Sequence, residues 1–279
     1  MNPRYLVFIP TKGRWKSRET IRLMGELGVP YKAVVEPQEY GNYAAVVNPD
    51  NIIVVPHRDE GLVTTRNWIW DYARDLGVER FWTFDDNIRR IYRWNNNQII
   101  PVDSGNVLCA IEDFVERYEN VPIAGMNYEM FVHRRRTQPV FQLNSRVYSN
   151  MLIETNAKDL GGKPYRNEGF YNDDTDLCLR VLKDGFCTIL FNAFLIDKQA
   201  TMRISGGNTP NYMGDGRYKM ALELQRKHPD VTKIVRKFGR WQHHVDYRGF
   251  KANKLIRKTD IEIPKGINEY GMKLVKVDK

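Results

Sequence analysis

Short apolar runs alternate with amphipathic stretches along the first half of the chain. Residues 5–9 (YLVFI) are rich in β-branched and aromatic side chains and end at a proline, which predicts a strand. Ser17 suits the N-cap of a helix over about 18–27, which Gly28 should end. By the same reasoning we expect strands over 31–35, 52–55 and 80–84 and a helix over 62–76. Strands that alternate with helices predict an α/β fold with a mostly parallel central sheet and right-handed crossovers.

The second half of the chain has a less regular pattern. We expect strands near 122–131, 139–154 and 186–196, and helices over 173–184 and 216–228. Residues after Trp241 are basic and polar, so this segment should wrap the surface or be disordered. No repeat, low-complexity tract or linker interrupts the sequence. We therefore predict a single domain over 1–250, followed by a basic C-terminal tail over 251–279.

The composition is that of an ordinary globular protein. Of the 279 residues, 42% are hydrophobic, which is enough for a sizeable core without disulfides. No stretch approaches the ~20 apolar residues that span a bilayer. The N-terminus lacks the layout of a secretory signal. The three cysteines (Cys109, Cys178 and Cys187) are widely spaced and odd in number, which favours buried thiols in a reducing cytoplasm.

The charge balance is more informative, because 43 lysines and arginines exceed 34 aspartates and glutamates and leave a formal charge of +9. A basic protein suits a polyanionic partner, since neutralising phosphates releases condensed counterions. The same balance is common in proteins that bind no nucleic acid. Charge by itself is therefore weak evidence for DNA.

Three loops follow predicted strands at their carboxyl ends, over 11–16, 56–61 and 85–87. In open α/β sheets the ligand crevice lies beyond these ends. The third loop contains Asp85 and Asp86, whose adjacent carboxylates repel unless a cation compensates. A divalent ion shared with a substrate diphosphate would do so. The alternative is a solvated turn, although a place directly after a buried strand favours the metal.

A second acidic cluster, NDDTD over 172–176, opens the helix predicted at 173–184. Helix capping and the helix dipole explain one or two acids at such a position. The sequence supplies three, with Glu168 shortly before them. A carboxylate at the edge of a pocket can also accept a proton from an attacking hydroxyl. Capping and catalysis are compatible, because different members of the cluster can do each.

The order of these features resembles GT-A glycosyltransferases, particularly the inverting enzymes similar to family 2. IPTKGR after the first strand is similar to their first nucleotide-binding loop, and GLVTTRN over 61–67 to their G-x-x-x-A-R-N helix start, with Thr65 in place of Ala. FDDN resembles the DxD metal motif with imperfect spacing. NDDTDL followed by LRVLKDGF resembles E-D-x-D-L with R-x-x-x-G-[FY]. Near the C-terminus, SGGN over 205–208 and GRWQHHVDY over 239–247 resemble the TET/JBP-associated glycosyltransferases, a GT-A group found largely in bacteriophages.

The resemblance implies a function and an assignment of residues. It implies a Rossmann-like domain whose residues 1–100 bind the nucleotide-sugar and whose residues 101–250 face the acceptor. The donor would be a UDP-sugar, the ion Mn²⁺ or Mg²⁺, and the acceptor a 5-hydroxymethylpyrimidine in double-stranded DNA, in the cytoplasm of a phage-infected host. Asp174 would be the catalytic base, with Asp173 in the place of the Glu beside it. The donor would contact Thr11, Lys12, Arg14, Arg66 and Asp85, and the metal would contact Asp86, Asn87 and either His243 or His244.

Two of these assignments have open alternatives. Arg66, at a helix start, could serve the donor phosphate or a buried acid. Arg134, Arg135 and Arg136 form the densest basic run and would contact acceptor phosphates, or one of them would hold the donor diphosphate; the alternative is an ordinary charged surface of a basic protein. Since a hydroxymethyl group already projects into the major groove, base flipping is optional in this interpretation.

Three functions therefore compete. The first is a DNA-modifying glycosyltransferase, and the second is a GT-A enzyme acting on a cell-envelope glycan or a protein. The third is a non-enzymatic nucleic-acid-binding module, which explains the charge but leaves both acidic clusters without a role. The sequence leaves open the sugar, the stereochemical outcome and the oligomeric state.

Overall fold

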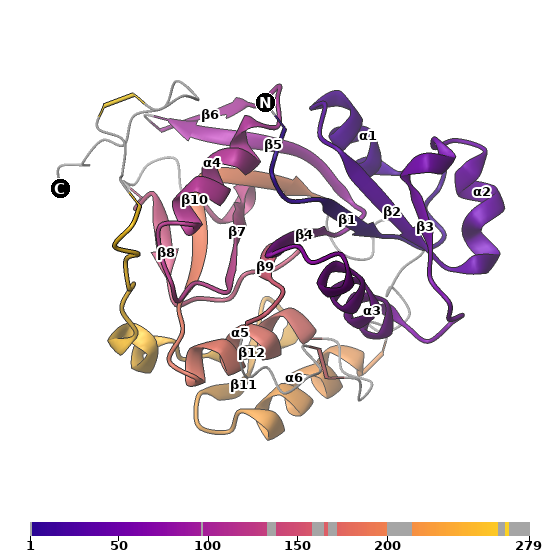
Figure 1. Cartoon of the computed structure of the whole chain (residues 1–279). Coiled ribbons are helices and arrows are strands. Elements are labelled where there is room, and N and C mark those ends of the chain that lie inside the picture. Colours follow the sequence, from indigo (N-terminus) through magenta and orange to yellow (C-terminus); the bar gives the residue numbers. More distant parts are fainter. Residues whose placement is uncertain are drawn as a thin grey trace.

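The computed structural model describes residues 2–95, 97–132, 138–157, 165–166, 172–199, 214–261 and 266–267. In this part of the chain, ten strands form one sheet in the order β3-β2-β1-β4-β9-β7-β10-β5-β6, with β8 paired to β10 (Figure 1). The strands are β1 (Val7–Pro10), β2 (Tyr31–Val35), β3 (Ile52–Val54), β4 (Arg80–Phe84), β5 (Ile88–Asn95), β6 (Gln98–Pro101), β7 (Ile123–Tyr128), β8 (Phe141–Leu143), β9 (Asn150–Glu154) and β10 (Thr188–Lys198). The prediction of an α/β domain on one large sheet is confirmed.

The first four strands are parallel, as their alternation with helices predicts. β1 lies between β2 and β4, and β3 pairs with β2. The crossovers are α1 (Glu19–Glu26) and α3 (Leu62–Asp75). Helix α1 begins at the N-cap Arg18, which makes no capping side-chain bond, and the Ser17 hydroxyl instead donates to the Arg14 carbonyl at 3.3 Å. The expected Ser17 cap is therefore wrong by one residue.

The second half of the sheet corrects the expectation of a mostly parallel arrangement. β9 runs antiparallel between β4 and β7, and β10 is parallel to β7 but antiparallel to β5 and β8. Gly125 on β7 permits the close approach of β9, since an added Cβ would lie 2.1 Å from the carbonyl oxygen of Asn150. This approach places Ser149, the residue before β9, beside the end of β4.

Helices cover both faces of the sheet. Helix α1 and helix α4 (Asn106–Val115) pack their apolar side chains into one core, while α3 and α5 (Asp173–Lys183) pack theirs into the core on the other face. Helix α4 is not predicted from the sequence, although its buried residues Val107, Leu108, Ile111 and Val115 recur at the spacing of one helical face. A short α2 (Tyr40–Ala44) flanks β3.

A second, two-stranded sheet lies outside the main one. It consists of β11 (Thr232–Lys237) and β12 (Arg240–Val245), which pack on α6 (Gly216–Lys227) and lie near α5 (Figure 1). We expected the segment after Trp241 to wrap the surface or be disordered; residues 241–245 instead belong to β12, and Arg248–Ala252 form a 3₁₀ helix. In β11 the two half-buried residues, Ile234 and Val235, are adjacent and are flanked by exposed lysines and arginine, so the two-residue period of a strand is not seen. No helix in the described ranges is both long and apolar enough to cross a membrane.

Candidate active site

The carboxyl ends of β1 and β4 bring Thr11 and Asp86 together. The Thr11 hydroxyl donates to Asp86 Oδ2 at 2.9 Å, and the Arg14 guanidinium forms an ion pair with Asp86 Oδ1. Tyr43 from α2 shares a 2.6 Å hydrogen bond with the same threonine. Asp86 is buried, and burial raises the pKa of its carboxyl against the opposing effect of Arg14. Both oxygens of Asp86 are thus held by the first loop.

Lys12 occupies the neighbouring part of this edge. Its ammonium lies 2.7 Å from Glu36, the residue after β2, and pairs with Asp59 from the loop before α3. The Asp59 amide donates to the same Glu36 carboxylate at 3.0 Å. Three loops that follow three parallel strands are therefore joined by one lysine and two carboxylates.

Arg66 joins the two acidic clusters. One guanidinium nitrogen, Nη2, donates to Asp85 at 2.9 Å. The other, Nη1, donates to Asp174 at 2.7 Å and also contacts Asp173. The Arg66 side chain is only 5% exposed, so three carboxylates from distant segments converge on a cation shielded from solvent.

The local structure of α3 fixes the direction of Arg66. Gly61, with φ of 89°, allows the chain to turn into the helix one residue before Leu62. One turn later, Asn67 exchanges two hydrogen bonds with the backbone of Tyr165, at 2.8 and 2.9 Å. The ring of Tyr165, buried against Trp70, lies 5.5 Å from the Arg66 guanidinium. The arginine is therefore held by its helix, by an aromatic face and by its acidic partners.

Lys198, the last residue of β10, is the second cation of this centre and is not among the predicted residues. It pairs with Asp85 Oδ2 and donates to the Ser149 hydroxyl at 2.8 Å. Burial acts to raise the pKa of the Asp85 carboxyl, but Lys198 and Arg66 outweigh burial and lower it to about 2. Burial also acts to lower the pKa of Lys198, and Asp85 reverses this effect. Asp85 and Lys198 are both charged at neutral pH.

Asp174 differs from Asp85 in its protonation. Burial raises the pKa of its carboxyl to about 7, Asp173 and Asp85 add to this rise, and Arg66 and Lys198 oppose it. The Ser149 amide donates to its Oδ2 at 3.3 Å. A carboxyl that titrates near neutrality at a partly open edge has the properties of a general base.

The remaining members of the second acidic cluster have structural roles. Asn172 is the N-cap of α5 but makes no capping side-chain bond, and it donates instead to the Met220 carbonyl of α6 at 3.0 Å. Asp176 is buried and accepts a 2.8 Å hydrogen bond from His228, which follows α6. The cluster therefore divides into two carboxylates on Arg66 and one that joins two helices.

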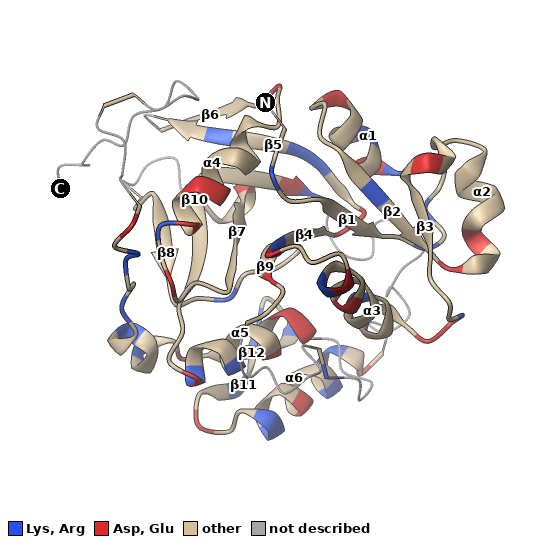
Figure 2. Cartoon of the chain, in the orientation of Figure 1, with Lys and Arg blue, Asp and Glu red and all other residues tan. Residues whose placement is uncertain are grey.

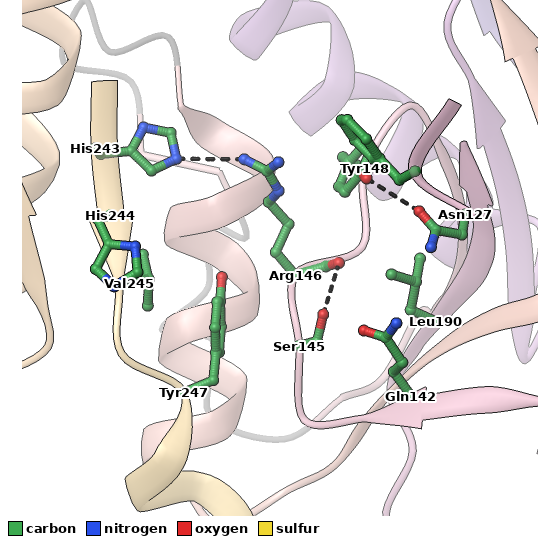
Figure 3. Close-up of a pocket in the computed structure, with 11 residues that line it drawn as sticks. Asn127, Gln142, Ser145, Arg146, Tyr148, Leu190, His243, His244, Val245 and Tyr247 are labelled. Carbon is green, nitrogen blue, oxygen red and sulfur yellow. Dashed lines mark hydrogen bonds between the residues drawn. The ribbon is translucent and has the colours of Figure 1, made fainter. Parts of the chain in front are cut away.

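The four predicted metal ligands do not come together. Asp86 faces Arg14 and Thr11, and the amide of its neighbour Asn87 lies 3.5 Å from the Gln199 carbonyl. His243 and His244 lie in β12 and line a different cavity, where His243 Nε2 is 3.3 Å from an Arg146 guanidinium nitrogen (Figure 3). Within the described ranges, no three side chains of His, Cys, Asp and Glu are grouped closely enough to hold a metal ion.

Some predicted residues lie outside the described residues. These are the basic run Arg134, Arg135 and Arg136, the acid Glu168 and the segment 205–208. Three residues of the site were missed by the sequence analysis, namely Lys198, Glu36 and Ser149. Glu36 and Lys198 each stand at the carboxyl end of a predicted apolar strand, so the rule that selected Asp85 could have found both.

The sequence over residues 5–207 matches the profile of the TET-associated glycosyltransferases. The chain belongs to this family. The family consists of glycosyltransferases, so the protein is an enzyme, and the alternative of a non-enzymatic nucleic-acid-binding module is excluded. No curated protein sequence matches the chain significantly.

Two solved structures give a remote comparison for this glycosyltransferase. The crystal structure of S. aureus TarS, residues 1–349, aligns with 92% of this chain and 99% of its own length, at 9% sequence identity and a TM-score of 0.43. A putative nucleotide-diphospho-sugar transferase from Desulfovibrio desulfuricans G20 covers 81% of this chain and 96% of its own, at 8% identity and a TM-score of 0.44.

Proposed function

We propose that this glycosyltransferase moves a sugar from a UDP-sugar to the hydroxyl of a 5-hydroxymethylpyrimidine in DNA, with Asp174 as the base. The observation that carries the proposal is the convergence of Asp85, Asp173 and Asp174 on Arg66 at the carboxyl edge of the sheet. The description of the family as TET-associated supports DNA as the acceptor, as does the formal charge of +9.

The Asp174 carboxylate performs the first part of the reaction. It takes the proton of the acceptor hydroxyl while the oxygen attacks the anomeric carbon of the sugar. The bond between that carbon and the diphosphate oxygen breaks, and its electron pair leaves with the nucleoside diphosphate. General-base assistance of this kind contributes typically ~10²–10⁴ in rate. A pKa of about 7 keeps a large share of Asp174 ionised at neutral pH while leaving it basic enough to accept the proton.

Cations at the same edge meet the charge that develops on the leaving diphosphate. Lys198 is fixed by Asp85 and Ser149, so its ammonium requires little reorganisation during the reaction. Lys12 and Arg14 lie in the first loop, where we propose that they face the donor phosphates while Thr11 positions Asp86. Glu36 follows β2 and accepts a hydrogen bond from Lys12; we propose that it also accepts one from the ribose, as an acid at the end of a second strand does in dinucleotide folds.

The described residues do not form a suitable site for a divalent ion. An ion on Asp86 would have to displace Arg14 and Thr11 from its two oxygens. Neither histidine of β12 contacts this carboxylate. We therefore derive no step through Mn²⁺ or Mg²⁺. Donor affinity measured in Mn²⁺, in Mg²⁺ and in a chelator tests the ion, and three equal affinities would remove it from the proposal.

An acceptor assay decides between the two remaining functions. The protein is incubated with labelled UDP-sugars and hydroxymethylated DNA, unmodified DNA, or no acceptor. We expect label on hydroxymethylated DNA alone. Donor hydrolysis without transfer to either DNA would favour a cell-envelope glycan or a protein as acceptor.

A further inference from the structure

A cavity of about 340 Å³ lies next to the acidic centre and has no role in the mechanism above. One wall is β12 with the residue Tyr247 that follows it, and the other is the segment 142–148 with Asn127 and Leu190 (Figure 3). Its volume falls within the range of small-molecule sites. This volume is enough for a single pyrimidine base.

Several polar side chains line the cavity, and two of them, Arg146 and His243, are hydrogen-bonded to each other at 3.3 Å. Arg146 makes no ion pair with any residue that the structure describes, and its guanidinium lies 4.4 Å from the ring centre of Tyr148. The amide of Gln142 has no hydrogen-bond partner in the described part of the chain, and Figure 3 shows it directed toward the space beside Leu190 and Ser145. Burial, with Arg146 and His244 adding to it, lowers the pKa of His243 to about 4, so this side chain is neutral. The cavity thus offers a guanidinium, an amide and a neutral imidazole beside aromatic rings.

These groups match the polar edge of a pyrimidine. Its ring carbonyl and ring nitrogen accept hydrogen bonds, for which Arg146 supplies donors, and an amide can both donate to and accept from the neighbouring position. Tyr148 contributes an aromatic wall to the cavity; its ring packs at right angles to that of Tyr128, with ring centres 4.5 Å apart, and the Arg146 guanidinium lies over it. Enzymes that take a base from the stack read its polar edge and stack its faces in this way.

The cavity is separated from the proposed base by a single residue. Tyr148 lines the cavity, and the amide of the next residue, Ser149, donates to Asp174. Asp174 itself is recessed, with its side chain 17% exposed. A hydroxymethyl group extends only two bonds from its ring, so we expect that a base paired in a duplex does not bring its hydroxyl to this recessed carboxylate. Entry of the base into the neighbouring cavity would bring the hydroxyl to Asp174.

The outer part of the β11–β12 hairpin adds an independent observation. Residues 231–245 contain no acidic side chain, and the four exposed cations Lys233, Arg236, Lys237 and Arg240 make no ion pair with a described residue. Figure 2 shows basic positions around β11, β12 and α6 in blue. An exposed, unpaired row of cations is the feature that binds a phosphate backbone.

A phenylalanine at the tip of this hairpin, Phe238, is an unfavourable choice if the turn serves folding only. Lys237 pairs with Arg240, which leaves Phe238 and Gly239 as a two-residue turn with φ of 52° and 71°. Turns with two positive φ values strongly prefer Asn-Gly, because a bulky side chain is strained there. The Phe238 ring is also 92% exposed. A strained and solvent-exposed aromatic residue indicates a function at this position.

We propose that the cavity receives a pyrimidine base turned out of a DNA strand, and that the hairpin grips this strand with Phe238 as a wedge at the vacated position. The inference rests on the proposed function, because it names how the DNA acceptor is bound. Apolar side chains that insert between base steps are a known means of opening a duplex. The base edge then contacts Arg146 and Gln142, and its 5-substituent points past Tyr148 to Asp174.

The decisive experiment compares binding to two duplexes that differ only in the partner of one 5-hydroxymethylcytosine. A mismatched partner reduces the cost of unpairing, so a protein that flips the base should bind the mismatched duplex about tenfold more tightly. A protein that reads the hydroxymethyl group in the major groove should bind both equally, and equal affinities would overturn the inference. If wild type transfers no sugar to hydroxymethylated DNA of any form, the proposed function fails instead.

Variants assign the effect to the cavity and to the hairpin. Phe238→Asn suits the turn, so it should fold at least as well as wild type and raise the KM for duplex DNA about tenfold, with little effect on a single-stranded acceptor. Gln142→Leu should lower kcat/KM for DNA about tenfold, whereas the matched change Gln98→Leu on β6 should not. Arg146→Gln should lower kcat/KM for DNA in the same way as Gln142→Leu. A loss of donor hydrolysis in these two variants would assign the cavity to the donor and refute the inference.

Discussion

The acidic centre and the β11–β12 hairpin differ in whether their cations are paired with acids and shielded from solvent. In the centre, Arg66 is buried and Lys198 is half-buried, and they are paired with Asp85, Asp173 and Asp174 before any substrate arrives. On the hairpin, four cations are exposed and no acid occurs between residues 231 and 245. Paired and buried charges are fixed in position, which suits stabilisation of a transition state. Unpaired surface charges exchange their counterions for phosphates, which suits binding to a polyanion.

This contrast predicts that the two regions fail differently when they are changed. Variants of the centre should alter the rate of transfer and its pH dependence, and they should be little affected by salt. Variants of the hairpin should alter DNA affinity and its salt dependence, and they should leave transfer at saturating DNA nearly intact.

The largest effect is expected for Asp174→Asn. Loss of the base should lower kcat about 10²–10⁴-fold. In wild type, kcat/KM should rise about tenfold per pH unit below the pKa of about 7 and level off above it, because only the ionised carboxylate accepts the proton. Steady-state kinetics between pH 5 and 9 measure both. Asp173→Asn is the matched control on the same arginine, and equal losses in the two variants would contradict the assignment of Asp174 as the base.

A smaller effect is expected for Lys198→Met, which keeps the length of the side chain and removes its charge. The loss should be roughly 10²-fold in kcat, similar to the removal of one preorganised donor at a developing anion. Because Lys198 lowers the pKa of Asp174, the rise of kcat/KM with pH should also move to higher pH. Lys198→Arg should restore part of the rate. A variant with wild-type kcat and an unchanged pH profile would show that Lys198 only neutralises Asp85.

The parallel half of the fold could be predicted from the sequence because each element there has a local signal. Strands over 31–35 and 80–84 and a helix start at Leu62 agree closely with β2, β4 and α3. The placing of Asp85 and Asp86 at the carboxyl edge followed directly from this topology. The antiparallel half could not be predicted in the same way. The pairing of β9 with both β4 and β7 joins segments that are far apart in the sequence and requires the close contact that Gly125 permits. A local sequence pattern does not indicate which distant strands will pair.

The candidate site divides along the same line. That two acidic segments would meet at one edge was expected, since one follows a strand and the other opens a helix. That Arg66 lies between them could not be decided, because the same helix start could face a phosphate or an acid. For the histidine pair, the sequence drew attention to the residues but predicted the wrong neighbours: His243 or His244 was expected beside Asp86, and both lie in β12 instead. Neighbours in a strand point to opposite sides: His243 is half-buried against Arg146 and His244 is exposed, although both border the cavity.

The hairpin should control the salt dependence of DNA binding. Changing Arg236 and Lys237 together to glutamine should reduce the slope of log affinity against log salt by roughly 0.9 for each phosphate that the variant no longer neutralises. Fluorescence anisotropy at several salt concentrations measures this slope, and kcat at saturating DNA should change little. The matched control is Arg22 with Arg90, two exposed cations on α1 and β5. An equal change of slope in the control would show that binding follows net charge and not the hairpin.

The smallest effect concerns stability, and it tests whether the centre is strained by its buried acids. Aspartate in an unfolded chain ionises near pH 4, whereas the pKa of Asp174 in the folded protein is about 7. Between these values the folded state keeps a proton that the unfolded state has released, so this residue lowers the free energy of unfolding as the pH rises. Asp174→Asn removes that loss, and each pKa unit corresponds to about 1.4 kcal/mol.

The variant should therefore match wild type near pH 4 and exceed it by at least about 1 kcal/mol above pH 7, where the loss is complete. Urea unfolding at pH 4, 6 and 8 measures the difference. Asp176→Asn provides the opposite control, because Asp176 accepts a buried hydrogen bond from His228 and the pKa of its carboxyl is lowered: burial acts to raise it, but His228 and Arg180 outweigh burial. That variant should be less stable than wild type at pH 8. If Asp174→Asn were also destabilised at pH 8, its ion pair with Arg66 would outweigh burial, and Asp174 would be a structural partner of the arginine and not a base kept near neutrality.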